Sequence, residues 1–140
     1  MHPFPYSSDE WDLVSTASLK VVNATLADDD VLRASCFIGL QEVLGELRTR
    51  HGEHPVLLET EADFTDDSRE RVDLYQRAIA LALANRLSTL SIRLSFARVY
   101  LEDLRQPAQA RHELVECQHE LTPDAEADME TWRELMSAIR

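Results

Sequence analysis

The chain has 140 residues, 44% of them hydrophobic and 29% charged, a composition typical of one globular domain and not of a disordered chain. The formal net charge of −12 argues against nucleic acid and against an anionic membrane as ligands. The longest apolar run, residues 78–84, is far shorter than the ~20 residues of a membrane span, and the N-terminus lacks the pattern of a secretory signal. The two cysteines, Cys36 and Cys117, are too few for a disulfide framework, so we expect a cytoplasmic protein.

The charge is distributed unevenly along the chain. Residues 1–67 carry 14 acidic and four basic side chains, whereas residues 68–121 carry seven acids and eight arginines. An acidic first half favours a basic partner, because complementary charge speeds association. Thirteen of the fourteen basic residues are Arg, which is typical of a GC-rich bacterial genome and also of surfaces that bind carboxylates.

Apolar residues spaced at i, i+3, i+4 and i+7 predict an all-α domain. We expect residues 1–8 to be flexible and residues 9–50 to form a helical hairpin, with helices over about 9–26 and 30–50. Between them lies the acidic triplet of residues 28–30, which we interpret as a helix cap and not as a metal site. Gly52 then follows as a C-terminal stop signal.

Residues 54–123 are predicted to form two further hairpins, and residues 124–140 a capping helix. Residues 90–96 alternate between apolar and polar with period two, which is a strand signal. We favour a helix there, because the apolar set continues through Ala97 and Leu101 and no second strand is available for pairing. The helices expected in this part of the chain cover about 54–64, 68–85, 89–104, 107–121 and 124–139.

A shift of 39 residues superimposes these two hairpins on each other. The helix starts coincide, Ser68 with Pro107, and so do positions expected to be buried, such as Tyr75 with Leu114. Each unit consists of a shorter helix and a longer one, and it can bury both of its faces only if a neighbour stacks on it. The repeat therefore predicts a stack of hairpins.

This pattern resembles the tetratricopeptide repeat (TPR) in a degenerate form. The residues that carry the resemblance are mostly small or apolar ones at the family's helix positions: Tyr75, Ala78, Ile79, Leu81, Ala97, Tyr100, Ala110, Leu114, Cys117 and Pro123. The resemblance implies a short right-handed array with a C-terminal capping helix and a concave groove lined by the first helix of each hairpin. It also implies that this groove binds a peptide or a partner helix.

The groove helix implied at about 89–104 carries the residues that we predict to bind a partner: Arg93, Leu94, Arg98 and Leu101. We expect the two arginines to be exposed, and Arg at the centre of an interface is a frequent hot spot. Some family members clamp a C-terminal carboxylate with paired lysine and asparagine. Since Lys20 is the single lysine of this chain, that clamp is not expected here in its usual form.

No motif in the sequence predicts catalysis, a metal site or a cofactor. Glu116 and His119 have the Glu-x-x-His spacing of a di-iron helix, but the chain has one such motif where two are needed. His51 and His54 flank Gly52 just after a predicted helix end, where His and Gly are expected as terminators. We therefore expect a protein that is not an enzyme.

The sequence leaves two candidate functions open. The first is a protein- or peptide-interaction module that binds its partner in the helical groove. The second is a small acidic immunity- or antitoxin-like protein that neutralises a basic effector with residues 9–67. For this second function the expected contacts are acidic: Asp28, Asp29, Asp30, Asp66 and Asp67. A homodimer is compatible with either function.

Overall fold

The protein, described over residues 1–139 by a computed structural model, is built from α-helices and one 3₁₀ turn, with no strand in that range. The helices are α1 (Ser8–Leu26), α2 (Asp30–His51), α3 (Pro55–Phe64), α4 (Ser68–Ala84), α5 (Leu90–Glu102), α6 (Pro107–Cys117) and α7 (Glu126–Ala138), with the turn η1 (Gln118–Glu120) after α6. The predicted all-α class is confirmed, and the helices before α7 begin within one residue of their expected starts. None of the described helices combines the length and apolar character needed to cross a bilayer.

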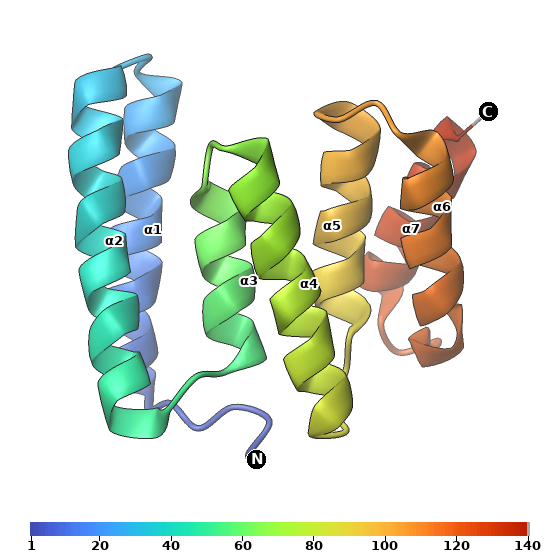
Figure 1. Ribbon diagram of the computed structural model, residues 1–140, viewed down its shortest axis with the longest axis horizontal. Helices are drawn as coiled ribbons and strands as arrows, with labels where there is room; N and C mark the ends of the chain where they lie inside the picture. Colours follow the sequence, from blue (N-terminus) through green and yellow to red (C-terminus); the bar gives the residue numbers. More distant parts are fainter. Residues whose placement is uncertain (140) are drawn as a thin grey trace.

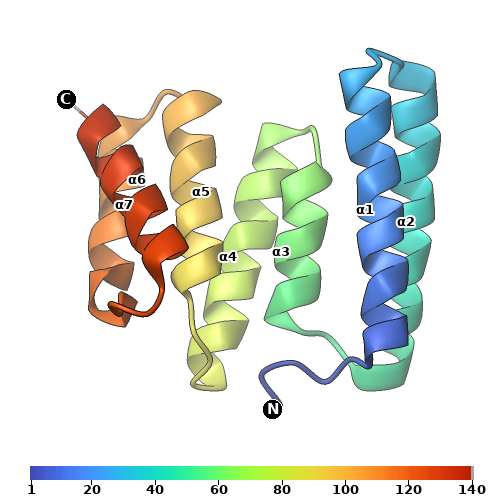
Figure 2. The same ribbon diagram turned by 180° about the vertical axis from the view of Figure 1, so that it is seen from behind.

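The helices form antiparallel hairpins that stand side by side in one row (Figure 1). α1 pairs with α2, α3 with α4 and α5 with α6, while α7 covers α5 and α6 at the C-terminal end. The loops after α1, α3 and α5 lie at one end of the hairpins, and the loops after α2, α4 and α6 at the other. One face of the row is formed by α2, α4 and α6, and the reverse view shows α1, α3 and α7 on the other face (Figure 2).

Local sequence signals account for the helix ends. Ser7 and Glu10 form a capping box, in which Glu10 N donates to Ser7 Oγ at 3.1 Å and Ser7 N donates to Glu10 Oε1 at 3.0 Å. Asp29 caps α2 by accepting a hydrogen bond from Leu32 N at 3.0 Å, so the acidic triplet acts as a cap through this residue. Gly52 ends α2 with a φ of 82°, a left-handed conformation that glycine adopts without strain.

Three hydrophobic clusters run along the row, and each is shared by consecutive elements. The first joins the N-terminal segment, α1, α2 and α3, the second joins α3, α4 and α5, and the third joins α5, α6 and α7. α5 therefore belongs to two clusters and is buried on two sides. This double burial explains the period-two pattern of residues 90–96, because a helix covered on both sides has few positions left for polar residues.

The N-terminal segment, which we expected to be flexible, packs against the first hairpin. The Tyr6 ring is buried and stacks on Trp11, with ring centroids 5.5 Å apart. Phe4 meets the same two rings edge to face, with ring centroids 5.2 Å from Tyr6 and 5.0 Å from Trp11. His54 Nε2 lies 2.9 Å from the carbonyl oxygen of His2 and ties this segment to the start of α3. The first residues thus close one end of the first hydrophobic cluster.

The first hairpin is longer than the others and rises past the ends of α3 and α4 (Figure 1). Its apolar spacing predicts broad buried stripes, but the structure buries a narrower set: Val14, Val21 and Ala24 on α1 and Leu40, Leu44 and Leu47 on α2. Of the eleven large hydrophobic side chains that are exposed within residues 1–139, seven lie between Leu13 and Ile38. Much of the apolar surface of this hairpin therefore faces solvent.

Candidate functional site

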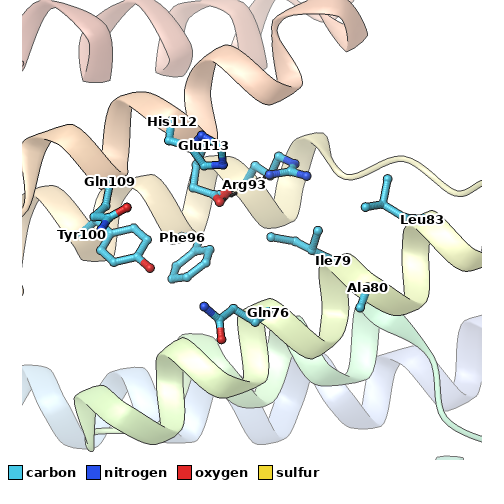
Figure 3. A pocket seen from close by; sticks show the side chains of 10 residues that line it. All are labelled: Gln76, Ile79, Ala80, Leu83, Arg93, Phe96, Tyr100, Gln109, His112 and Glu113. Carbon is cyan, nitrogen blue, oxygen red and sulfur yellow. Dashed lines mark hydrogen bonds and ion pairs between the residues drawn. The ribbon is translucent and has the colours of Figure 1, made fainter.

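A pocket of about 400 Å³ opens between α4 and α6, with α5 at its base (Figure 3). Its lining comes from three helices: Gln76, Ile79, Ala80 and Leu83 from α4, Arg93, Phe96 and Tyr100 from α5, and Gln109, His112 and Glu113 from α6. Because these helices belong to two neighbouring hairpins, the pocket exists only when the hairpins are stacked.

Stacked aromatic rings form the base of the pocket. The rings of Phe96 and Tyr100 lie 4.4 Å apart between centroids, and the rings of Tyr75 and Phe96 lie 5.2 Å apart, both pairs nearly parallel. Tyr75 and Phe96 are buried, whereas Tyr100 is half-buried and reaches the opening. The base is therefore a rigid apolar surface with one partly exposed ring.

A buried ion pair forms one wall of the pocket. Arg93 Nη1 lies 2.8 Å from Glu113 Oε2, and the two residues are only 8% and 7% exposed. Arg93 Nε also donates to Thr89 Oγ1 at 3.1 Å, which fixes the orientation of the guanidinium. Since the two charges compensate each other within the fold, this wall favours neither an anionic nor a cationic ligand.

The rim of the pocket is polar and exposed. Gln76 on α4 faces Gln109 and His112 on α6 across the opening (Figure 3). Amide and imidazole groups can donate and accept hydrogen bonds without carrying a fixed charge. An apolar base below a ring of such groups is suited to binding an uncharged side chain whose tip is polar.

The four predicted partner-binding residues do not share one surface. The expectation that Arg93 is exposed is wrong, because α6 covers its side chain and supplies Glu113 as its partner. Leu94 is buried in the cluster of α5, α6 and α7, and Leu101 is half-buried at the edge of the same cluster. Arg98 is exposed, with Glu102 Oε1 at 3.4 Å from its Nη1, and is the most accessible of the four.

Arg98 belongs to a second, smaller hollow of about 240 Å³, lined by residues of α3, α4 and α5. Asp63 lines this hollow, and its Oδ1 accepts from Tyr75 Oη at 2.5 Å. One turn earlier on α3, Glu59 Oε2 accepts from Ser91 Oγ at 2.8 Å. Burial raises the pKa of Glu59 to about 7, and the nearby charge of Asp63 adds to the rise while the Ser91 hydrogen bond opposes it. This hollow is more polar than the pocket between α4 and α6.

The two histidines that flank Gly52 are engaged in structural contacts. His51 Nε2 lies 2.9 Å from Glu10 Oε2, and His54 Nδ1 accepts a hydrogen bond from Val56 N at 3.1 Å. Within residues 1–139, no group of three or more His, Cys, Asp or Glu side chains is arranged to hold a metal ion. His51 joins α2 to the start of α1, and His54 caps α3.

The structure brings the two predicted acidic runs, residues 28–30 and 66–67, to the same end of the molecule. Arg33 in α2 links the end of α1 to the loop after α3, since its Nε donates to Thr25 Oγ1 at 2.9 Å and its Nη1 lies 2.7 Å from Asp66 Oδ2. Its Nη2 also donates to the carbonyl oxygen of Phe64 at 3.0 Å. Asp28 and Asp30 are exposed beside this link.

No protein-family model, curated protein or solved structure matches this chain. The TPR resemblance therefore stays a prediction, and the structure agrees with its coarser content, antiparallel hairpins packed in chain order.

Helix spacing alone could have singled out Glu113, which sequence reasoning missed. It lies three residues after Ala110 and four before Cys117, on the face of α6 that those residues bury. A carboxylate on a buried face needs a cationic partner, and Arg93 is that partner. The rim amides carried no comparable signal, because exposed glutamines are ordinary on helix surfaces.

Proposed function

We propose that this chain is a non-catalytic module that binds a protein or peptide, built as a degenerate, right-handed TPR-like array. The observation that carries the proposal is the pocket between α4 and α6, with its stacked aromatic base and exposed amide rim. This pocket opens between the second helices of two hairpins, and not in the groove of first helices that the TPR resemblance implies. Aromatic-lined pockets of this size accept single anchor side chains of a partner. The two free cysteines, Cys36 and Cys117, fit a partner met in the reducing cytoplasm.

The anchor that we propose is an uncharged aromatic or aliphatic side chain. It would cover Phe96 and Ile79 at the base and place a polar tip near His112 or the rim amides. A charged anchor is disfavoured, because the compensated pair of Arg93 and Glu113 offers no net counter-charge. Arg98, on the other side of α5, would contact a partner only if it also reached that side.

A substitution that fills the pocket tests this proposal. Ala80 is exposed and lines the pocket, so Ala80→Trp would occupy it without entering the core. Ala127 is exposed on α7 outside the pocket, and Ala127→Trp is the matched control. Peptides selected from a random displayed library on the unmodified protein should bind the Ala127→Trp variant normally and lose about tenfold or more in affinity for the Ala80→Trp variant. Equal binding to both variants, or no enrichment of any peptide, would contradict the proposal.

A second candidate function is neutralisation of a basic effector. What supports it is the acidic first half of the chain, together with the convergence of residues 28–30 and 66–67 on one end of the molecule. Asp29 and Asp67 act as helix caps and Asp66 is paired with Arg33, so charge reversal there would also affect folding. Asp28 and Asp30 are exposed and serve the test better as Asn variants, because Asn tolerates the positive φ of Asp28 and adds no cation to the first turn of α2. These replacements should slow association with a basic effector and reduce its salt dependence.

A further inference from the structure

The exposed apolar residues of the first hairpin include one stripe on each of its helices, and both stripes end at the loop that joins α1 to α2. On α1 the stripe consists of Leu19, Val22 and Leu26, spaced i, i+3 and i+7, and on α2 it consists of Val31 and Ile38, spaced i and i+7. We call these five residues the tip surface. Leu26 is 80% exposed and Val31 is 84% exposed, and only the short loop between α1 and α2 separates them.

The core of the protein makes no use of this surface. Val14, Val21 and Ala24 are the buried residues of α1, and they lie on a different side of the helix from Leu19, Val22 and Leu26. The hairpin also rises past α3 and α4, which therefore leave its tip uncovered (Figures 1 and 2). Apolar side chains gathered on a projecting element are typical of a surface that another molecule covers.

The charges around the tip surface indicate what covers it. Asp28 and Asp30 are exposed at the loop, and the pair of Asp66 with Arg33 lies beside them. The basic residues nearby do not offset these acids: Lys20 lies on a different face of α1 from the stripe, and Arg33 is bonded to Thr25, Phe64 and Asp66. A second copy of the chain, with its net charge of −12, would bring acids against acids.

From this combination we infer that the tip surface is a docking site for a basic amphipathic helix of a partner protein. The apolar side of that helix would cover Leu26, Val31 and Ile38, and Lys or Arg residues flanking its apolar side would face Asp28 and Asp30. This inference deepens the second candidate function by adding a defined apolar surface to the acidic end of the molecule, and it does not involve the pocket between α4 and α6.

Two designed helical peptides with the same leucine pattern test the inference, one with lysines and one with glutamates at its polar positions. Binding is measured by fluorescence anisotropy at two salt concentrations. The variant is Leu26→Gln/Val31→Gln, and its control is Leu83→Gln/Val115→Gln, which changes two exposed apolar residues of α4 and α6. All four positions are exposed, so both variants should fold, which circular dichroism would verify.

The lysine peptide should bind the unmodified protein, and the glutamate peptide should bind at least about tenfold more weakly. The tip variant should lose about tenfold or more in affinity for the lysine peptide, and the control about twofold at most. Amide chemical-shift changes should fall on residues 19–38. Replacing Asp28 and Asp30 by Asn should weaken binding and lower its salt dependence.

Three results would overturn the inference. Unchanged binding by the tip variant would mean that acids alone attract the peptide, which would leave the neutralising function standing without an apolar site. A loss confined to the control would place the peptide at the α4–α6 pocket, which Leu83 lines. A dimer in sedimentation that the tip variant converts to a monomer would make a second copy the occupant.

Discussion

Arg93 Nη1 and Glu113 Oε2 are 2.8 Å apart in the interface between α5 and α6, and among residues 1–139 neither side chain has another oppositely charged partner within salt-bridge distance. The pair links two helices of one hairpin while forming the wall of a pocket shared with the hairpin before it. A substitution that breaks this ion pair is therefore expected to alter the pocket as well as the packing of α5 against α6.

Arg93→Ala is expected to lower the free energy of unfolding by about 3 kcal/mol, because it leaves the Glu113 carboxylate buried without its cation. Arg98→Ala is the matched control and should cost less than about 1 kcal/mol, since the pair of Arg98 with Glu102 is exposed. Urea denaturation of both variants provides the comparison. Equal losses would contradict the burial of Arg93, and an Arg93→Met/Glu113→Leu variant should recover most of the stability.

Tyr6→Phe is expected to raise the free energy of unfolding by up to about 1 kcal/mol. The Tyr6 hydroxyl is buried without a hydrogen-bond partner, and burial, together with the charge of Glu53, raises its pKa to about 12. Tyr6→Ala should instead lower the free energy of unfolding by about 3 kcal/mol, because it removes the ring that packs on Trp11. Thermal denaturation would compare the stability of both variants with that of the unmodified protein. A marked loss of stability in Tyr6→Phe would show that the Tyr6 hydroxyl makes a hydrogen bond in the folded protein.

Glu59 should make stability fall as the pH rises from about 4.5 to about 7. Its pKa is higher in the folded chain, so the folded state holds the proton more tightly and is favoured on the acidic side of that range. Glu59→Gln cannot ionise and should remove this fall, with a gain on the order of 2 kcal/mol at pH 8 and little change at pH 4.5. Denaturation curves of Glu59→Gln and of the unmodified protein at pH 4.5 and pH 8 would measure this difference in the free energy of unfolding. An equal gain at both pH values would rule out the titration of Glu59 as its cause.

Thiol labelling should distinguish the two cysteines. Cys117 is fully buried, and burial raises the pKa of its thiol to about 11, so it should react only when the protein unfolds. Cys36 is half-buried and should react in the folded protein. A chromogenic disulfide reagent should therefore label one thiol per chain in buffer and two in denaturant. The Cys36→Ser variant assigns the fast reaction, and rapid labelling of that variant in buffer would refute the burial of Cys117.

Helix positions could be predicted from the sequence because their signals are local. Ser7, Asp29, Gly52 and Asp67 act at the helix ends where residue preferences predict them. Spacing also identified a helix at residues 90–96 despite the alternating pattern there. These predictions depend on residues only a few positions apart.

The exposure of individual residues could not be predicted in the same way, because it depends on which neighbour covers which face of a helix. Arg93 and Arg98 are five residues apart on α5, yet α6 covers the first and leaves the second exposed. Leu26 and Val31 lie on the sides of α1 and α2 that face away from the buried residues of the first hairpin, and past the end of α3, so no other helix of the described chain covers them. Long-range packing decides both cases.

Every pair of extensively packed helices in the described chain consists of elements one or two places apart in chain order. Contacts that close only short loops form quickly, so the chain is expected to fold faster than a sheet protein of its size. The same arrangement limits how far cooperativity spreads, because each hairpin is stabilised by its own pairing and by its immediate neighbours. The first hairpin has a neighbour on one side only and meets the others through α3. We expect this terminal unit to open more readily than the central helices, so its backbone amides should exchange with solvent deuterium before those of α4 and α5.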